Sequence, residues 1–158
     1  MPTAQPHLSP MPTKEHYLLI ADYTITAYGQ TITVPRFFHY DGASVPAIAW
    51  QATYEPFHPD VMAAALVHDW LYYVHHANQT PIDRDLADNI LETLFRQNGV
   101  SYVKLQMMMA AVRMAGYLVW DNSAENKAVL KHVFTALKAD GETEPGIWQK
   151  YCLRPDMF

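Results

Sequence analysis

The chain of 158 residues is half hydrophobic and 13% aromatic, which is enough apolar material for one sizeable core and excludes a chain that is disordered throughout. Its formal net charge of −5 argues against a basic face for nucleic acid. Only 17% of the residues are charged, below the roughly 25% typical of soluble domains. A surface with few charges suggests that a partner protein, or a second copy of the chain, covers part of it.

Neither a membrane span nor a signal peptide is predicted. The longest apolar runs, Val61–Val67 and Met114–Trp120, are far shorter than the ~18 residues that a membrane helix needs. The first thirteen residues carry no Lys or Arg and no apolar stretch, so a secretory signal is not expected. The single cysteine, Cys152, excludes a disulfide framework within the chain, and its aromatic surroundings predict a packing role.

The N-terminal part predicts an extended arm followed by β-structure. Four prolines in the first thirteen residues forbid a helix, so residues 1–15 are expected to be disordered or to lie on a neighbouring protein. His16–Tyr28 and Thr31–Phe38 are rich in β-branched and aromatic residues, and Gly29-Gln30 between them predicts a two-residue hairpin turn. Pro35 cannot donate a ladder hydrogen bond, so the second strand ends there or lies at an edge.

Helical patterns fill the rest of the chain. Four helices are expected at about Pro59–Ala77, Pro81–Asn98 with Thr80 as N-cap, Ser101–Trp120, and from Ser123 to just before Gly141. Short connections between them predict antiparallel neighbours. The aromatic, proline-containing residues 141–158 predict an irregular strap. We therefore predict one α+β domain over residues 16–140, with an N-terminal β-hairpin or small sheet followed by a bundle of about four helices.

Two titratable residues, His68 and Asp69, lie in the middle of the first predicted helix, in a stretch apolar enough to be buried. Buried polar groups need partners, because an unsatisfied buried charge costs several kcal/mol. Tyr72 lies one turn after His68 on the same face of the helix. His75 and His76 come near the helix end, about 10 Å beyond His68, where we expect them to be solvated or to cap the helix.

The second predicted helix offers a matching carboxylate. Asp88 lies among apolar residues and could reach the imidazole of His68. Asp83 and Asp85 lie near the helix start, where we expect the helix dipole to stabilise their negative charges. Arg84, one turn before Asp88, could pair with Asp69 or with Asp88.

A loop upstream of the helices carries the sequence Asp41-Gly-Ala-Ser44-Val-Pro46. Taken alone, it predicts an ordinary Asx-type turn. Taken with the helices, it could bring Asp41 and Ser44 to the pair formed by His68 and Asp69.

The third predicted helix contains the run Met107–Met109 and Met114. Methionines at this spacing are usually core filler, which we expect here in preference to an adaptable binding face. The few cations nearby are too sparse to suggest a track for nucleic acid.

The loop and the two helices together resemble a family of small proteins of unknown function encoded by bacteriophages and prophages. Its members carry an Asp-x-Ala-Ser-[Val/Ile]-Pro loop, a His-Asp-x-Leu-Tyr helix and an Arg-x-x-x-Asp helix in this order, and the resemblance covers about residues 16–120. The family's loop usually continues Pro-Arg, whereas here Pro46 is followed by Ala47, so any role of that arginine is absent or taken over. The resemblance implies a phage or prophage origin and no settled activity.

The helical residues also resemble the core of phospholipases A2. That resemblance implies that His68 is the base that activates water, that Asp69 binds Ca²⁺, that Asp88 orients the imidazole, and that Tyr72 is a hydrogen-bond partner in the site. The segment between residues 46 and 57 has no glycine, unlike the calcium loop of that family. A metal-assisted hydrolase with another oxygen site is therefore favoured over a phospholipase.

Two functions follow. The first is a phage structural or accessory protein, a tail or connector component of the virion, in which His68, Asp69, Arg84 and Asp88 form a buried polar network. Its partners would be other phage or virion proteins, and it would reside in the bacterial host cytoplasm or in the virion. The alternative is a hydrolase with His68 and Asp88 as base and orienting group, and with Asp69 and Asp41 binding a divalent cation such as Ca²⁺ or Zn²⁺. A small inhibitor of a host protein fits only the size and the acidity.

Overall fold

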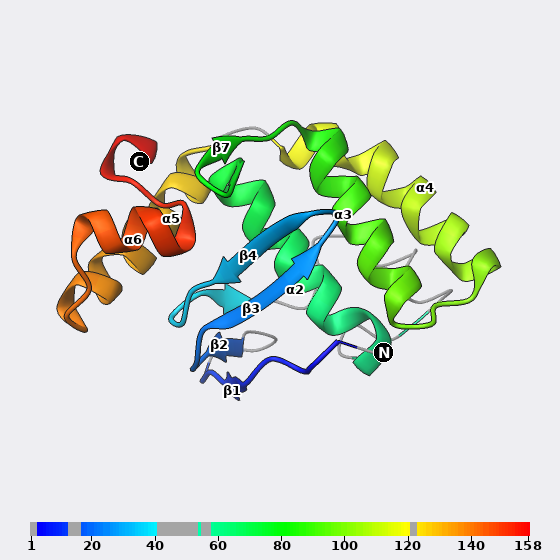
Figure 1. Cartoon of the computed structure of the whole chain (residues 1–158), viewed down its shortest axis with the longest axis horizontal. Helices are drawn as coiled ribbons and strands as arrows, with labels where there is room; N and C mark the ends of the chain where they lie inside the picture. Colours follow the sequence, from blue (N-terminus) through cyan, green and yellow to red (C-terminus); the bar gives the residue numbers. More distant parts are fainter. Residues whose placement is uncertain (1–2, 13–16, 41–53, 55–57, 121–122) are drawn as a thin grey trace.

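Small antiparallel sheets come first in the chain and helices follow, so the predicted α+β class is confirmed (Figure 1). The computed structural model describes residues 3–12, 17–40, 54, 58–120 and 123–158. The strands are β1 (Leu8–Pro10), β2 (Tyr17–Leu19), β3 (Tyr23–Ala27), β4 (Gln30–Val34), β5 (His39–Tyr40), β6 (His76–Ala77) and β7 (Thr80–Pro81). The helices are α2 (Pro59–Val74), α3 (Arg84–Gln97), α4 (Tyr102–Val119), α5 (Ala124–Ala139) and α6 (Glu144–Tyr151), before a final 3₁₀ turn at Pro155–Met157.

The hairpin β3–β4 forms where a hairpin was predicted, with a turn that is shifted by one residue. Ala27 pairs with Gln30, so the central residues are Tyr28 and Gly29, with φ of 53° and 70°. The predicted turn at Gly29-Gln30 is therefore wrong. Positive φ at both central positions gives a turn whose twist matches that of the two strands. β4 ends at Val34, as expected before a proline.

The single strand predicted over His16–Tyr28 is broken into β2 and β3, which belong to different sheets. Asp22, in the break, accepts a hydrogen bond from the backbone N–H of Arg36 through its side chain at 3.0 Å. β2 pairs instead with β1 and β5 in the order β1-β2-β5. The polar side chain thus takes the place of a ladder hydrogen bond and lets the chain change sheets.

The proline-rich N-terminal segment lies on the chain's own domain. Leu8 pairs with Leu19 across β1 and β2, and the hydroxyl of Tyr23 donates to the carbonyl of Ala4 at 2.7 Å. The backbone N–H and hydroxyl of Thr3 both donate to Oδ1 of the buried Asn98, each at 2.9 Å. Residues 3–12 are extended, as proline requires. These contacts hold them against residues of the same chain, so no neighbouring protein is needed to order them.

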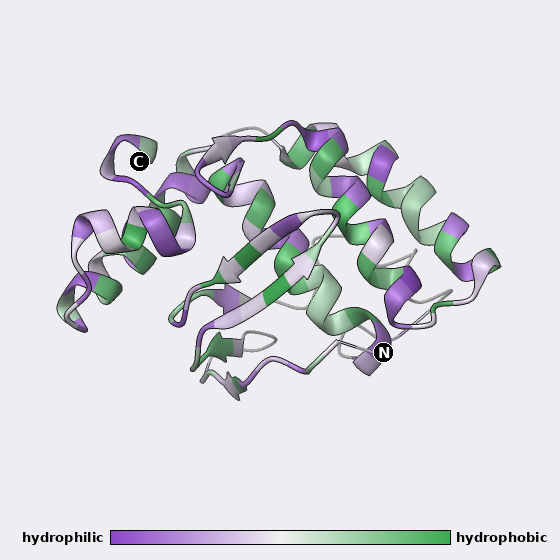
Figure 2. Cartoon of the chain, viewed as in Figure 1, coloured by the Kyte–Doolittle hydropathy of each residue, from purple (hydrophilic) through white to green (hydrophobic). Residues whose placement is uncertain are grey.

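Helix α2 is the centre of the core. Apolar residues lie on all its sides, and eleven of its sixteen residues are buried. In Figure 1 the hairpin β3–β4 crosses α2, α3 packs beside it, and α4 packs against α3. The hydropathy colouring in Figure 2 shows the apolar residues of α2 beneath the hairpin. Burial on every side explains why α2 has no polar face and why its few polar side chains must find partners in the interior.

The connection between α2 and α3 differs from the prediction. α2 ends at Val74, and β6 and β7 form a short hairpin around Asn78 and Gln79, which have φ of 47° and 59°. Pro81 lies in β7, so the predicted helix start with Thr80 as N-cap is wrong. Asp83 is the N-cap of α3, because its carboxylate accepts a hydrogen bond from the N–H of Leu86 at 2.8 Å.

The C-terminal region is more regular than predicted. Ser123 caps α5 as expected, accepting from the N–H of Asn126. Residues 144–151, predicted to be irregular, form α6, because Thr143 supplies an N-cap and Pro145 occupies the first turn, where its missing N–H costs nothing. Cys152 is 8% exposed, which confirms its packing role.

Candidate functional site

His68 on α2 and Asp88 on α3 face each other in the interior. His68 Nε2 lies 2.8 Å from Asp88 Oδ1, and the two residues are only 5% and 1% exposed. The expected contact between these side chains is therefore present. It arises because α2 and α3 pack side by side and each places its only buried ionisable groups at the same level of the interface.

Tyr72 completes the cluster. Its hydroxyl donates to the same Asp88 Oδ1 at 2.7 Å, and its ring packs on that of His68 with centroids 4.1 Å apart. Burial, followed by the hydrogen bond to Asp88, raises the pKa of Tyr72 well above its ordinary value, so the hydroxyl stays protonated and donates. In contrast, Asp88 Oδ2 is buried and has no hydrogen-bond partner among the described residues.

The contacts of Asp88 fix the tautomer of His68. A carboxylate only accepts hydrogen bonds, so Nε2 must carry the proton that Asp88 receives. In the neutral imidazole, Nδ1 is then the unprotonated nitrogen and keeps its lone pair. The cluster therefore holds an oriented imidazole that can take a proton at Nδ1.

Gly116, on α4, makes room for Tyr72. A Cβ atom at Gly116 would lie 2.6 Å from the Tyr72 hydroxyl and 3.3 Å from Arg84 Cδ. A distance of 2.6 Å is shorter than any normal carbon–oxygen contact, so a side chain at this position would displace the hydroxyl. α4 thus contributes to the site through the absence of a side chain at Gly116. No pattern in the sequence indicated this role for the glycine.

Arg84 lies next to the cluster without binding Asp88. Its Nη2 is 3.9 Å from Asp85 Oδ1 on its own helix. Its positive charge acts against the rise in the pKa of Tyr72 that burial and Asp88 cause. Arg84 and Asp88 form no ion pair: Asp88 Oδ1 contacts His68 and Tyr72, and Oδ2 has no hydrogen-bond partner in the described part of the chain.

The predicted cation site is only partly within the described residues. Asp69 follows His68 on α2 and is half-buried, and its charge contributes to the raised pKa of Tyr72. Asp41 and Ser44 lie outside the described residues. Within the ranges that are described, no three His, Cys, Asp or Glu side chains are arranged to hold a metal ion. The divalent cation stays a prediction.

The two histidines at the end of α2 are structural. His75 is the C-cap, with φ of 53°, and its ring stacks on Trp120 at a centroid distance of 4.0 Å. His76 Nδ1 lies 2.8 Å from the carbonyl of Val74. The expected capping role of His75 is confirmed, and both rings are half-buried rather than solvated.

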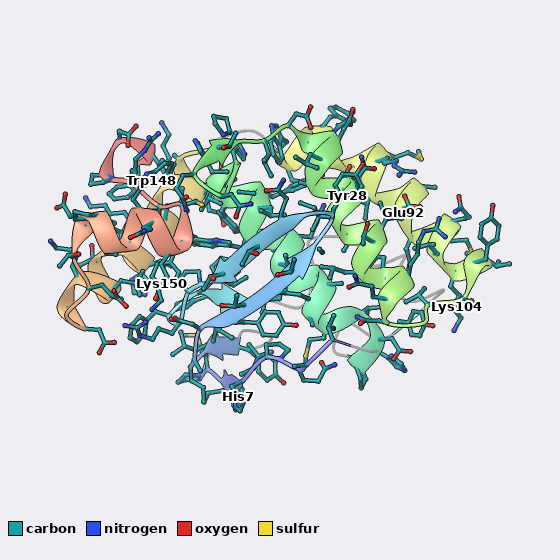
Figure 3. All side chains as sticks on the ribbon, viewed as in Figure 1. His7, Tyr28, Glu92, Lys104, Trp148 and Lys150 are labelled. Carbon is teal, nitrogen blue, oxygen red and sulfur yellow. The ribbon has the colours of Figure 1, made fainter. Side chains whose placement is uncertain are left out.

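A second polar cluster was not predicted. Arg36 Nη1 binds Asp22 at 3.1 Å and its Nη2 binds Glu142 at 3.2 Å. Tyr151 and Lys150, the latter labelled in Figure 3, bind Asp22 at 2.8 and 3.2 Å. Burial opposes ionisation of Asp22, but the donated hydrogen bonds outweigh it and hold its pKa below the ordinary value; the Arg36 guanidinium likewise lowers the pKa of Glu142. The cluster joins the hairpin to α6. No short motif signals it, because its members are up to 129 residues apart.

A pocket of about 390 Å³ lies on another part of the molecule, between β4, the β6–β7 hairpin and α6. Cys152 lines it, and its Sγ accepts a hydrogen bond from the N–H of Gln79 at 3.3 Å. Burial raises the pKa of the Cys152 thiol, so the sulfur is not a reactive thiolate. None of His68, Tyr72 and Asp88 lines this pocket.

No helix in the described ranges combines the length and the apolar character needed to cross a membrane. Comparison with known proteins finds no match among curated proteins and none among solved structures. A family model described as a protein of unknown function, DUF1353, matches residues 18–112, which is more than half of the chain and includes His68, Tyr72 and Asp88. The match ends before Gly116. The chain therefore belongs to the DUF1353 family of proteins of unknown function.

Proposed function

We propose that the protein is a hydrolase in which His68 is the general base and Asp88, with Tyr72, holds the imidazole in its working orientation. The observation that carries the proposal is the pair of hydrogen bonds on one carboxylate oxygen: His68 Nε2 and the Tyr72 hydroxyl both contact Asp88 Oδ1. This arrangement leaves Nδ1 as the basic nitrogen.

The proposed reaction is attack of water on an ester carbonyl. Nδ1 of His68 takes a proton from water as the oxygen bonds to the carbonyl carbon, and the protonated imidazole then gives that proton to the leaving oxygen. Asp88 stabilises the positive charge on the ring during these steps, and Tyr72 keeps the carboxylate in place. The ester class follows from the resemblance of this helix pair to phospholipases A2.

A purely structural cluster would be expected to be more stable than this one. Asp88 Oδ2 is buried without a hydrogen bond among the described residues, a state that costs about 1–3 kcal/mol. Polar networks that serve packing alone are normally satisfied. The unsatisfied Asp88 oxygen therefore favours a site retained for chemistry.

Asp69 and Asp41 are proposed to supply oxygen ligands for a divalent cation, such as Ca²⁺ or Zn²⁺, which would stabilise the developing oxyanion. Calorimetric titration with Ca²⁺, Mg²⁺ and Zn²⁺ tests this part of the proposal. Saturable binding that Asp69→Asn abolishes is the expected result. Absence of binding by all three ions would remove the cation from the mechanism and leave His68 as an unassisted base.

The activity is tested with a panel of chromogenic carboxylic esters of different acyl length. Wild-type protein is expected to hydrolyse at least one ester faster than buffer, and His68→Gln is expected to lose that activity while it keeps its circular dichroism spectrum. His132→Gln is the matched control, because His132 is an exposed histidine on α5. Equal rates for wild type and His68→Gln on every ester would disprove the proposal.

A second candidate function is a structural or accessory component of a phage particle, with other virion proteins as partners. The low content of charged residues and the apolar outer face of α4 favour it, together with the resemblance to phage and prophage proteins. In this role the protein would be found in the bacterial host cytoplasm and in the virion. Co-sedimentation of the tagged protein with purified particles would support this candidate, and its absence from them would oppose it.

A further inference from the structure

Helix α4 has one buried face and one apolar face that is exposed. The buried residues include Leu105, Met108 and Met109, which confirms part of the prediction that the methionines fill the core. Met107 and Met114 are 48% and 76% exposed, so for them the prediction is wrong. In Figure 1 α4 runs along the edge of the molecule beside α3.

The exposed residues are spaced for pairing with another helix. Val103, Met107, Ala110, Met114 and Tyr117 follow one another at intervals of four, three, four and three residues, and all of them are exposed. Alternation of three and four is the spacing of the contact positions in helices that pack side by side. These five residues are called the α4 seam below.

Charge does not oppose contact between two such seams. α4 contains no carboxylate, and the seam itself contains no charged residue. The two cations of the helix are engaged within the chain: Lys104 lies 4.2 Å from the centre of the Tyr54 ring, and Arg113 Nη2 binds Glu92 on α3 at 2.7 Å (Figure 3). Neither cation needs to be desolvated when the seam is covered.

The inner three residues of the seam, Met107, Ala110 and Met114, read the same in both directions. Ala110 is at the centre, a methionine lies on each side of it, and Val103 and Tyr117 lie at the two ends. When two copies pack antiparallel, Met107 faces Met114 of the second copy, and the two small Ala110 side chains meet at the crossing point. Such self-complementarity is what a two-fold interface requires, since both partners use the same surface.

The exposed area also fits a dimer better than a monomer. Leu118, which is 68% exposed, adjoins the seam on the same side of the helix. The seam and Leu118 together expose on the order of 600 Å², near the upper end for the largest patch on a typical monomer and approaching the roughly 800 Å² that each partner buries in a standard interface. We propose that the protein forms a two-fold dimer through antiparallel contact of the α4 seams.

The mass of the full chain in solution tests this dimer. Sedimentation equilibrium of wild type is expected to show a concentration-dependent species of twice 18.0 kDa. Met114→Lys places a cation in each copy at a buried position and is expected to raise the dimer dissociation constant by roughly 100-fold or more. Ile20→Lys is the matched control, because Ile20 is 55% exposed and lies outside α4, so its dimer should be unchanged.

Cross-linking tests the orientation independently of Met114→Lys. When Val103→Cys and Tyr117→Cys proteins are mixed and oxidised, the expected product joins one copy of each variant. A wild type that is monomeric at all concentrations would overturn the proposal, as would a dimer that Met114→Lys leaves intact. Val103→Cys protein that cross-links to itself, but not to Tyr117→Cys protein, would overturn the antiparallel orientation.

Discussion

Gly116 and Tyr72 give the sharpest stability prediction. In Gly116→Ala, the new Cβ would lie 2.6 Å from the Tyr72 hydroxyl, so either the tyrosine or α4 must move. Overpacking of this kind costs about 1–3 kcal/mol, and the better helix propensity of alanine returns up to about 1 kcal/mol. We expect a net loss of about 1–2 kcal/mol in the free energy of unfolding.

Tyr72→Phe removes the hydroxyl that the glycine accommodates. Loss of the hydrogen bond to the Asp88 carboxylate is expected to cost about 1.5–3 kcal/mol. In this background the Gly116→Ala clash disappears: the nearest remaining atoms are Arg84 Cδ at 3.3 Å, on a side chain that can move, and the Tyr72 ring carbon Cζ at 3.6 Å. Gly116→Ala should then be neutral, or stabilising by up to about 1 kcal/mol.

Urea unfolding of wild type, both single variants and the double variant measures this coupling, with tryptophan fluorescence as the signal. The expected coupling energy is about 1–3 kcal/mol and favours the double variant over the sum of the single changes. If Gly116→Ala cost the same free energy with Tyr72 as with Phe at position 72, the reasoning about the space at Gly116 would be refuted.

Three further predictions concern regions away from His68. The pKa of Asp22 is lower in the folded than in the unfolded chain, so the unfolded chain binds more protons in acid. The free energy of unfolding should therefore fall as pH drops below about 4. Arg36→Met should weaken that dependence, as measured by urea unfolding between pH 7 and pH 3. Cys152 should react with a thiol reagent at the rate of unfolding and not faster, because its thiol is buried and has a raised pKa; rapid modification of native protein would contradict this. Asn98→Ala should lose about 1–3 kcal/mol and expose the N-terminal segment to protease, because Thr3 loses its acceptor; unchanged proteolysis would count against the contact.

The central contact of the site could be predicted from local patterns. An apolar helix that contains His68 and an adjacent helix that contains Asp88 leave few other partners for either side chain, since buried polar groups must be paired. Helical spacing alone placed Tyr72 on the face of His68. The class of the fold and the cap at Ser123 were available from the same kind of local signal.

Long-range packing could not be predicted in this way. The role of Gly116 depends on how α4 approaches α2, which no pattern within either helix encodes. The cluster around Arg36 joins residues from the hairpin and from the C-terminal helix. The predicted start of α3 was wrong for a different reason. Thr80-Pro81 and Asp83 both resemble helix starts, but Thr80 and Pro81 pair in the β6–β7 hairpin, so the helix begins after Asp83.

The rate of ester hydrolysis by Asp88→Asn, relative to wild type, tests most directly whether the buried cluster orients a catalytic base. The substitution keeps the shape of the side chain and removes the charge that stabilises the protonated imidazole. We predict a fall of at least about 100-fold in a protein that remains folded by circular dichroism. Equal rates for the two proteins on every ester, whether or not they exceed the rate in buffer, would contradict a catalytic role for His68 and Asp88 and assign the cluster to packing.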